Sequence, residues 1–356
     1  MSSLTGTWML YGANGYTGEL IAREACARQR APILAGRNAT AIERLARELG
    51  CEWRQFALDD EAALTRALTG VSTVLHCAGP FSSTARPMIR ACIASRVHYL
   101  DITGEIEVFE WARRMDDEAR RAGVLLCPGA GFDVVPSDCL AAQLKAALPD
   151  ATHLALGFDS RSKPSRGTAK TMIERLQHGS AVRVDGKIIS IPFASRVREI
   201  DFGEGPRSAI AIPWGDVSTA FYTTGIPNIE VYIPASPRAI RRMRSLSRLR
   251  FLLGLPAVRT WLKRRVDRGA PGPDDEQRAH TPVLLWGEGR TASGRTVVGR
   301  IRVPNGYTTT VHAALSLIER TLTQSVPVGY RTPSQVVGAD FLSRLTGATK
   351  VSMSAR

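Results

Sequence analysis

Short apolar segments alternate with longer amphipathic segments over the first third of the chain. The apolar segments, which predict buried strands, lie near 7–11, 32–36, 52–57, 71–77, 97–101 and 124–127. The segments between them have the ends of helices: Asn38 is a predicted N-cap with Gly50 as the stop, and Asp60 is the next N-cap before Gly70. Further helices are expected at about 85–95 and 105–122. Strands that alternate with helices predict a Rossmann-type α/β fold with a doubly wound parallel sheet.

The pattern changes after Pro136. A helix is expected to run to Leu148, and strand-like segments then follow at 152–158, 181–191, 196–202, 207–213, 228–233, 282–287 and 296–303. Turns such as Asp185-Gly186 join them, which predicts a second, mixed and mostly antiparallel α+β domain. We therefore predict a first domain over 1–149 and a second over 150–324. Residues 325–356, with a last helix at about 333–345, are expected to return to the first domain.

The first predicted strand leads directly into a turn with regularly spaced glycines. Gly12, Gly15 and Gly18 allow a tight turn, a close approach of the backbone to a pyrophosphate, and close packing of the next helix on the strand. Ala13 stands where the strict fingerprint has its first glycine, so an ordinary strand-to-helix turn is the alternative. The amides predicted to face the phosphates are those of Asn14, Gly15, Tyr16 and Thr17.

The second predicted strand ends in Gly36, Arg37 and Asn38, where an NAD-specific fold usually places an acid. The Arg37 guanidinium is suited to a 2′-phosphate, which favours NADP over NAD. The alternative is a solvated surface charge. Ala78, Gly79 and Pro80 after the fourth strand are expected near the nicotinamide. The predicted cofactor-binding residues are thus Gly12, Asn14, Gly15, Tyr16, Thr17, Gly18, Arg37, Asn38, Ala78, Gly79 and Pro80.

The loops after the fifth and sixth strands carry titratable groups that should converge on the same end of the sheet. These groups, with one hydroxyl, are His98, Tyr99, Asp101, Thr103, Glu105, Asp133 and Asp138. We take Tyr99, Asp101 and Glu105 as candidate catalytic residues, with helix capping and core packing as the alternative. Lys170, in a Gly-Thr-Ala-Lys turn that opens a helix of the second domain, is a fourth candidate, with a surface turn as its alternative.

The composition bears on metal binding, membrane insertion and cellular location. The chain has 356 residues, of which 44% are hydrophobic, and its six cysteines form no CxxC pair or metal-like cluster, so no metal site is expected. There is no apolar segment long enough to span a membrane and no predicted signal region. These features predict a cytoplasmic protein. Peripheral binding to the inner face of the membrane is the alternative location.

The positive charge is concentrated in one segment. Of the formal net charge of +14, residues 236–268 carry +10, from ten Arg and one Lys against one Asp. A helical stripe of Ile240, Met243, Leu246, Leu249 and Leu253 alternates there with Arg238, Arg241, Arg242, Arg244 and Arg248. Such a segment suits an anionic membrane or an acidic acyl-carrier protein. The alternative is a packed helix with an arginine-rich outer face, and a nucleic-acid partner ranks below both.

Several motifs together carry a family resemblance. They are GANGYTG at 12–18, AGRN at 35–38, AGPF at 78–81, YLDITGE at 99–105, GFDVVPSD at 131–138, GT at 167–168, GPDDEQR at 272–278, NGYTTT at 305–310 and RTPSQVVG at 331–338. The chain resembles the saccharopine dehydrogenase-like oxidoreductases, in particular the branch with the trans-acting enoyl reductases of mycobacterial lipid synthesis. The resemblance implies NADP(H) use and a Rossmann domain with a mixed-sheet second domain.

These observations predict an NADPH-dependent reductase of an acyl or polyketide-type enoyl lipid precursor. Its active site is expected between the domains, and a homodimer is one of the expected assembly states. An amino-acid or opine dehydrogenase of the saccharopine type is the enzymatic alternative. A scaffold or sensor that binds NADP without turnover is the non-catalytic one.

Overall fold

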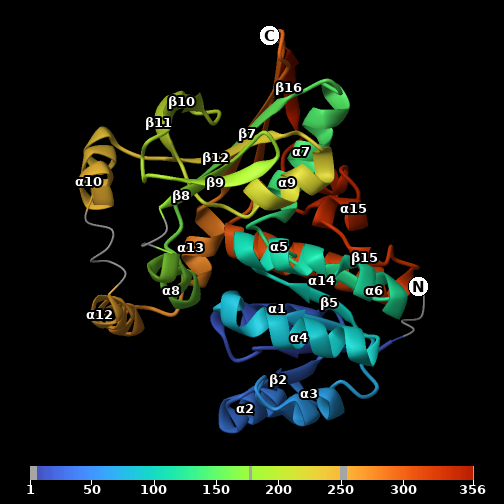
Figure 1. Cartoon of the computed structure of the whole chain (residues 1–356). Coiled ribbons are helices and arrows are strands. Elements are labelled where there is room, and N and C mark those ends of the chain that lie inside the picture. The colour runs from blue at the N-terminus through green and yellow to red at the C-terminus, as the bar shows by residue number, and fades with distance from the viewer. Residues whose placement is uncertain (1–5, 176–178, 249–254, 356) are drawn as a thin grey trace. The chain divides into compact units, whose positions relative to one another are not determined.

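The computed structural model describes residues 6–175, 179–248 and 255–355 and divides the chain into two compact units (Figure 1). The first unit comprises Met1–Val135 and Tyr307–Gly338, and the second comprises Pro136–Gly306 and Ala339–Arg356. This division differs from the predicted one in two places. The first boundary lies at Val135 rather than at residue 149, and the returning segment is 307–338 rather than 325–356.

The first unit is built on a seven-stranded parallel sheet with the order β15-β6-β5-β4-β1-β2-β3. Its central strands are fully buried, and Leu10 of β1 pairs with Leu34 of β2 on one side and Leu75 of β4 on the other. The predicted doubly wound sheet is thus confirmed, with its switch point between β2 and β4 at β1. The strands are β1 (Trp8–Tyr11), β2 (Ile33–Gly36), β3 (Trp53–Gln55), β4 (Thr73–His76), β5 (His98–Asp101), β6 (Leu125–Cys127) and β15 (Gly329–Tyr330).

Two helices of the first unit have the predicted N-caps, whereas the helix expected at 85–95 begins at Phe81 and the one expected at 105–122 is divided into two. Asn38 accepts a hydrogen bond from the amide of Ala41, Asp60 accepts one from Ala63, and Gly50 ends its helix with a φ of 68°. The helices are α1 (Tyr16–Ala27), α2 (Ala39–Leu49), α3 (Glu61–Ala67), α4 (Phe81–Ser95), α5 (Ile106–Arg114), α6 (Asp116–Ala122), α14 (Gly306–Thr323) and α15 (Pro333–Val337).

The segment that returns to the first unit adds both a helix and an edge strand. In Figure 1 it is orange to red, whereas the rest of this unit is blue to green. β15 pairs in parallel with β6, and Thr321 of α14 hydrogen-bonds to Thr73 of β4 at 3.0 Å. The return therefore begins with α14, earlier in the chain than the sequence pattern predicts.

The second unit contains a nine-stranded mixed sheet. Seven strands follow the order β10-β11-β12-β7-β13-β14-β16, and β8 joins β12 and β9 beside this path. Only the β7–β12 pair is parallel among the described strand pairs of this sheet, which confirms the predicted mostly antiparallel domain. The strands are β7 (His153–Ser160), β8 (Ser180–Val184), β9 (Lys187–Ile191), β10 (Val197–Asp201), β11 (Pro206–Ala211), β12 (Asn228–Pro234), β13 (Val283–Arg290), β14 (Thr296–Val303) and β16 (Ser352–Ala355).

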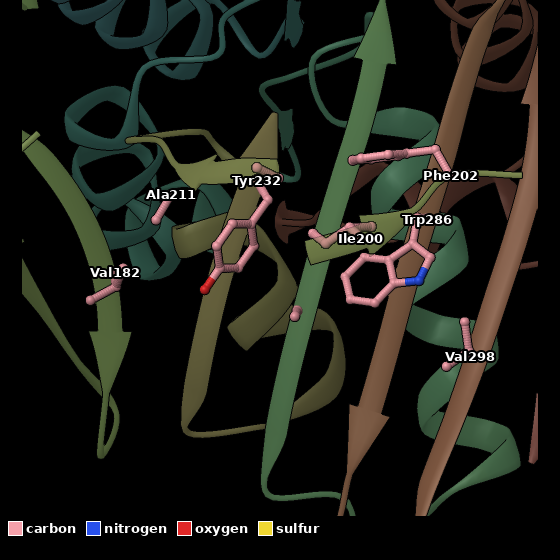
Figure 2. Close-up of a cluster of buried hydrophobic side chains, with 9 residues drawn as sticks. Val182, Ile200, Phe202, Ala211, Tyr232, Trp286 and Val298 are labelled. Carbon is pink, nitrogen blue, oxygen red and sulfur yellow. The ribbon is translucent and has the colours of Figure 1, made fainter. Parts of the chain in front are cut away.

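One face of this sheet is covered by the helix α7 (Val135–Ala147). A Cβ added at Gly287 of β13 would lie 2.7 Å from Leu144 Cδ1, and one added at Gly299 of β14 would lie 2.8 Å from Leu140 Cδ1. This close packing explains why α7 belongs to the second unit although it directly follows β6 and its loop in the chain. An aromatic cluster that includes Tyr232 and Trp286 also packs on this sheet (Figure 2).

The other helices of the second unit include the basic segment. They are α8 (Arg166–Arg175), α9 (Asp216–Thr224), α10 (Pro237–Arg248), α12 (Pro256–Asp267), α13 (Asp275–His280) and α16 (Phe341–Arg344). Ile240 of α10 is buried in a small core with Ala194 and Ile210, and Met243 packs against it. The described part of the apolar stripe therefore packs inside the unit, as the structural alternative predicted. Leu249 and Leu253 lie outside the described residues, as do the side chains of Leu246 and Arg248.

Membrane-spanning helices, metal-binding groups and cysteines can be compared with the expectations from composition. Within the described ranges, no helix is both long and apolar enough to cross a membrane, and no group of His, Cys, Asp and Glu side chains is arranged to hold a metal ion. The six cysteines are free thiols, and Cys92, Cys127 and Cys139 are buried.

Candidate functional site

The turn after β1 requires glycine at two of its three predicted positions. Gly12 has a φ of +83°, and a Cβ on it would lie 2.7 Å from the amide nitrogen of Ala78. A Cβ on Gly18 would lie 2.3 Å from the carbonyl oxygen of Gly12. The backbone of α1 thus approaches the end of β1 too closely for any side chain, as in a dinucleotide-binding turn.

Gly15 has a different part in the same turn. It is the N-cap of α1 with an extended conformation, φ −80° and ψ 158°, and the nearest atom to an added Cβ is the Gly12 carbonyl oxygen at 3.3 Å. A side chain would therefore fit the protein but would stand beside the first amides of α1, where the helix dipole favours an anion. Tyr16 and Thr17 follow in this first turn, and the Tyr16 ring meets Tyr307 of α14 edge-on at 5.0 Å.

A pocket of about 450 Å³ opens beside this turn, at the carboxyl ends of β1, β2 and β4. It brings together five of the predicted cofactor residues from three separate segments. Its lining residues are Tyr11, Gly12, Asn14, Gly36, Arg37, Asn38 and Ala78. In a doubly wound sheet this is the place where a dinucleotide binds.

The rim of the pocket carries the predicted 2′-phosphate ligand. Arg37 is exposed, and its backbone carbonyl accepts a 3.4 Å hydrogen bond from Gln55 Nε2, so the residue is fixed at its main chain while the guanidinium faces solvent. Asn38 is also exposed, but its side chain caps α2. Gly36 leaves room for Asn14, whose Oδ1 would lie 3.3 Å from a Cβ at position 36.

These observations fit an NADP molecule. The glycine turn leaves space for a pyrophosphate, and the pocket ends at a cationic group rather than at the carboxylate that NAD requires. Tyr11 forms part of the floor, where burial raises its pKa to about 12 and its hydroxyl donates to the Phe56 carbonyl. The floor is thus neutral, and Arg37 is the charged group among the lining residues.

Two buried carboxylates connect the loops at the ends of the next strands. Both carboxylate oxygens of Glu105 accept hydrogen bonds of 2.9 Å, one from the amide of Phe81 and one from the amide of Ser82. Glu105 therefore caps the start of α4 and holds the loop of Ala78, Gly79 and Pro80 against the loop before α5. Its contacts are those of a positioning residue, and its predicted role in proton transfer stays a prediction.

Asp101 connects two further loops. Its Oδ1 accepts hydrogen bonds from the amides of Thr103 and Gly129 at 3.0 and 2.9 Å, and its Oδ2 accepts one from the Tyr99 hydroxyl at 2.7 Å. Burial raises the pKa of Asp101 to about 6, and these hydrogen bonds oppose the shift. The contacts match the capping and core-packing alternative, so a catalytic role for Tyr99 and Asp101 also stays a prediction.

The buried network continues from Tyr99 to the predicted nicotinamide loop. His76 Nδ1 lies 3.4 Å from the Tyr99 hydroxyl, and Nε2 lies 3.2 Å from the carbonyl oxygen of Ala78. Burial lowers the pKa of His76 to about 3, so the ring is neutral near pH 7 and donates from Nε2 to this carbonyl. The sequence analysis did not single out His76, because a histidine inside an apolar strand looks like a core residue.

Asp133 is the acid that the structure singles out beyond the predicted catalytic set. It is half-buried in the loop after β6, and a Cβ added at Gly104 would lie 2.9 Å from its Oδ2. Burial raises the pKa of Asp133 to about 7. The loop is fixed by a 2.9 Å hydrogen bond from the Phe132 amide to Thr310 of α14. A carboxyl group that is half-protonated near neutral pH suits general acid chemistry.

Lys170 lies in α8 of the second unit, on a helix as predicted. Its Nζ is 2.6 Å from Asp267 Oδ1 of α12, and both side chains are partly exposed. The ion pair gives Lys170 a structural partner, and its predicted catalytic role is not tested by this contact.

The chain is similar to known proteins in both sequence and fold. Residues 8–127 match the saccharopine dehydrogenase NADP-binding domain family. A probable mitochondrial saccharopine dehydrogenase-like oxidoreductase of Arabidopsis thaliana is 34% identical over 155 residues, covering 36% of this chain and 32% of that protein. A trans-acting enoyl reductase of Mycobacterium leprae is 31% identical over 147 residues, covering 38% of this chain and 34% of the relative. The matched region thus spans about a third of each relative.

The fold comparison extends over nearly the whole chain. The apo saccharopine dehydrogenase (L-Glu forming) of Saccharomyces cerevisiae superposes with a TM-score of 0.64 at 11% identity, covering 98% of this chain and 100% of the other. This likeness shows the shared fold of both units. The sequence similarity to the saccharopine dehydrogenase NADP-binding domain family is confined to residues 8–127, which contain the glycine turn.

Proposed function

We propose that the chain is an NADP-dependent oxidoreductase. The pocket at the carboxyl ends of β1, β2 and β4, with Arg37 on its rim, is the observation that carries the proposal. Gly12 and Gly18 shape the phosphate turn, Arg37 binds the 2′-phosphate, and the loop of Ala78, Gly79 and Pro80 borders the nicotinamide. Bound NADPH supplies a hydride to the substrate.

Asp133 is the proton donor in this proposal. Addition of a hydride to the β-carbon of an enoyl thioester places negative charge on the α-carbon and the carbonyl oxygen. Protonation of the α-carbon then completes the reduction. The carboxyl group of Asp133 can supply that proton because its pKa is raised to about 7. Asp101 and Glu105 act through the loops that they hold together, so they are positioning residues.

The proposed substrate is an acyl or polyketide-type enoyl thioester. The loops after β4, β5 and β6, at 77–81, 102–105 and 128–134, contain no Lys or Arg. An amino-acid or opine dehydrogenase needs cations to bind substrate carboxylates, and these loops of the first unit offer none. The similarity to a trans-acting enoyl reductase supports the same choice.

The proposed partner is an acidic acyl-carrier protein that delivers the substrate. Arg238, Arg241 and Arg242 of α10 are exposed, while Ile240 on the same helix is buried. The described part of the helix thus presents positive charge outward while Ile240 and Met243 pack inward, which favours a protein partner with complementary charge.

NADPH oxidation assays with two substrate sets test the proposal. Turnover is expected with 2-enoyl thioesters and not with 2-oxo acids plus amino acids. The Gly15→Val variant, which should not bind the cofactor, controls for background oxidation. Turnover only with oxo acid and amino acid would instead support the saccharopine-type alternative, and tight NADPH binding without turnover on either set would support a scaffold or sensor.

A further inference from the structure

A second pocket, of about 220 Å³, lies wholly within the second unit. It forms where five strands of the nine-stranded sheet meet: the starts of β7, β10 and β12 and the ends of β8 and β13. The register shows the construction, because His153, the first residue of β7, pairs with Asn228 of β12 on one side and with Arg290 of β13 on the other.

The polar residues that line the pocket lie next to an apolar cluster on the same face of the sheet. Two residues further along the same three strands, Glu230 and Glu288 flank Ala155, and two residues beyond these, Tyr232 and Trp286 flank Gly157. Side chains two residues apart in a strand share one face of the sheet. The polar rows therefore continue into the cluster of Tyr232, Trp286 and Ala155 (Figure 2). Of this cluster, Ala155 also lines the pocket.

Two arginines of the pocket are held by carboxylates. Arg198 Nη2 lies 3.1 Å from both carboxylate oxygens of Glu288, and its guanidinium lies 4.9 Å from the centre of the Trp286 ring. Arg196 forms an ion pair with Glu230, which also accepts a hydrogen bond from the Tyr232 hydroxyl. These contacts fix the shape of the wall.

Two further arginines give the pocket an excess of positive charge. Arg183 is buried, donates to the carbonyls of Val217 and Gly186 at 2.8 and 2.7 Å, and lies over the Phe221 ring. Arg290 is exposed at the mouth beside His153; burial and then the charge of Arg290 lower the pKa of the His153 imidazole, and the charge of Asp185 opposes this shift. The lining therefore contains four guanidinium groups and two carboxylates.

We propose that this pocket binds a compact anionic ligand through a phosphate or carboxylate group, with Arg290 and His153 at the point of contact. Low-dielectric walls with surplus positive charge concentrate an anion, and Arg binds both oxyanions in the same way. The volume of about 220 Å³ limits the ligand to a small metabolite and excludes a dinucleotide. The site shares no lining residue with the cofactor pocket.

The test is a titration of the whole chain carrying Arg37→Gln. This substitution removes the arginine that is predicted to bind a phosphate group in the first unit. Inorganic phosphate and succinate are added separately at constant ionic strength, and the His153 imidazole resonance is followed by NMR, assigned by its loss in a His153→Gln variant. The proposal predicts a saturable shift with at least one of the two anions. Saturation with phosphate alone or succinate alone identifies the group that the site prefers.

Two further variants decide whether the binding is specific. Arg290→Gln should weaken it about tenfold or more, the scale of one charge-assisted contact. Arg302→Gln removes an exposed arginine of β14 outside the pocket and should leave the affinity unchanged. A shift that does not saturate with either anion, or an equal loss in both variants, would overturn the proposal.

Discussion

The amide of Gly129 donates a 2.9 Å hydrogen bond to Oδ1 of Asp101, which precedes it by 28 residues. The same oxygen accepts the amide of Thr103, so one carboxylate joins the loops that follow β5 and β6. Glu105 joins the β5 loop to the start of α4 in a similar way. Three strand-end loops that border the proposed nicotinamide site are therefore held together by two buried acids.

Replacing Glu105 by Gln tests this arrangement. The amide NH₂ of Gln would face one of the two backbone amides that Glu105 now binds, leaving a buried donor without an acceptor. We expect the free energy of unfolding to fall by about 1–3 kcal/mol, measured by urea denaturation. Glu118→Gln, at an exposed site in the first turn of α6, is the matched control and should change stability little. Equal stabilities of the two variants would contradict the positioning role.

Gly15→Val should remove cofactor binding and leave the fold intact. The Gly15 backbone is extended, so Val fits, but its side chain would occupy the space in front of the α1 amides. Gly18→Ala should do the opposite and destabilise the fold, because its Cβ would lie 2.3 Å from the Gly12 carbonyl oxygen. Calorimetric titration with NADPH and thermal unfolding separate the two effects. Normal NADPH binding by Gly15→Val would place the phosphate site elsewhere.

The sequence was sufficient to predict the first sheet because its signals are local. Buried parallel strands are continuous apolar segments, and helix ends carry caps such as Asn38 and Asp60. Which sheet a helix covers depends instead on distant contacts. Leu140 and Leu144 of α7 pack on Gly299 and Gly287, and no local pattern indicates this.

The same distinction applies to the candidate site. The glycine turn and Arg37 were predictable because each belongs to a motif with fixed spacing. Asp101, Glu105 and Asp133 were visible only as acids at strand ends. Their environments depend on loops far apart in the sequence: Asp101 and Glu105 accept hydrogen bonds from amides of other loops, and Asp133 lies beside Gly104.

Asp133 predicts a pH dependence of stability. An unfolded Asp ionises near pH 4, whereas folded Asp133 has a pKa of about 7. Its contribution to stability is therefore fully present below pH 4 and is lost as the pH rises to about 7. Asp133→Asn lacks this titration, so its stability relative to the native protein should increase between pH 4 and pH 8, measured by urea unfolding. A pH-independent difference would contradict the raised pKa.

The same group predicts a pH dependence of activity. If Asp133 donates the proton, kcat should fall above about pH 7 as the carboxyl group ionises, and Asp133→Asn should abolish that limb of the profile along with most of the rate. An unchanged pH profile in the variant would assign the proton to another group. NADPH affinity should stay near the native value, which shows that the cofactor site is intact.

The arginine face of α10 predicts a salt-dependent partner. Replacing the exposed Arg238, Arg241 and Arg242 by Gln should weaken binding of an acidic acyl-carrier protein and leave NADPH affinity unchanged. The native interaction should weaken as salt is raised, because exposed charges are screened within roughly 8 Å at physiological ionic strength. Arg244, which donates to the Ala194 carbonyl, is kept to preserve packing. Unchanged carrier binding, or binding only to anionic vesicles, would contradict this choice of partner.

The affinity difference between NADPH and NADH tests the central claim most directly. Arg37 is exposed on the rim of the cofactor pocket, and it is the one charged residue among those that line this pocket. Calorimetry should show that the native protein binds NADPH more tightly than NADH. Arg37→Ala should narrow the gap by about 1–3 kcal/mol, the scale of a charged hydrogen-bonded contact. Equal affinities for the two cofactors in the native protein would contradict the assignment of this pocket to NADP.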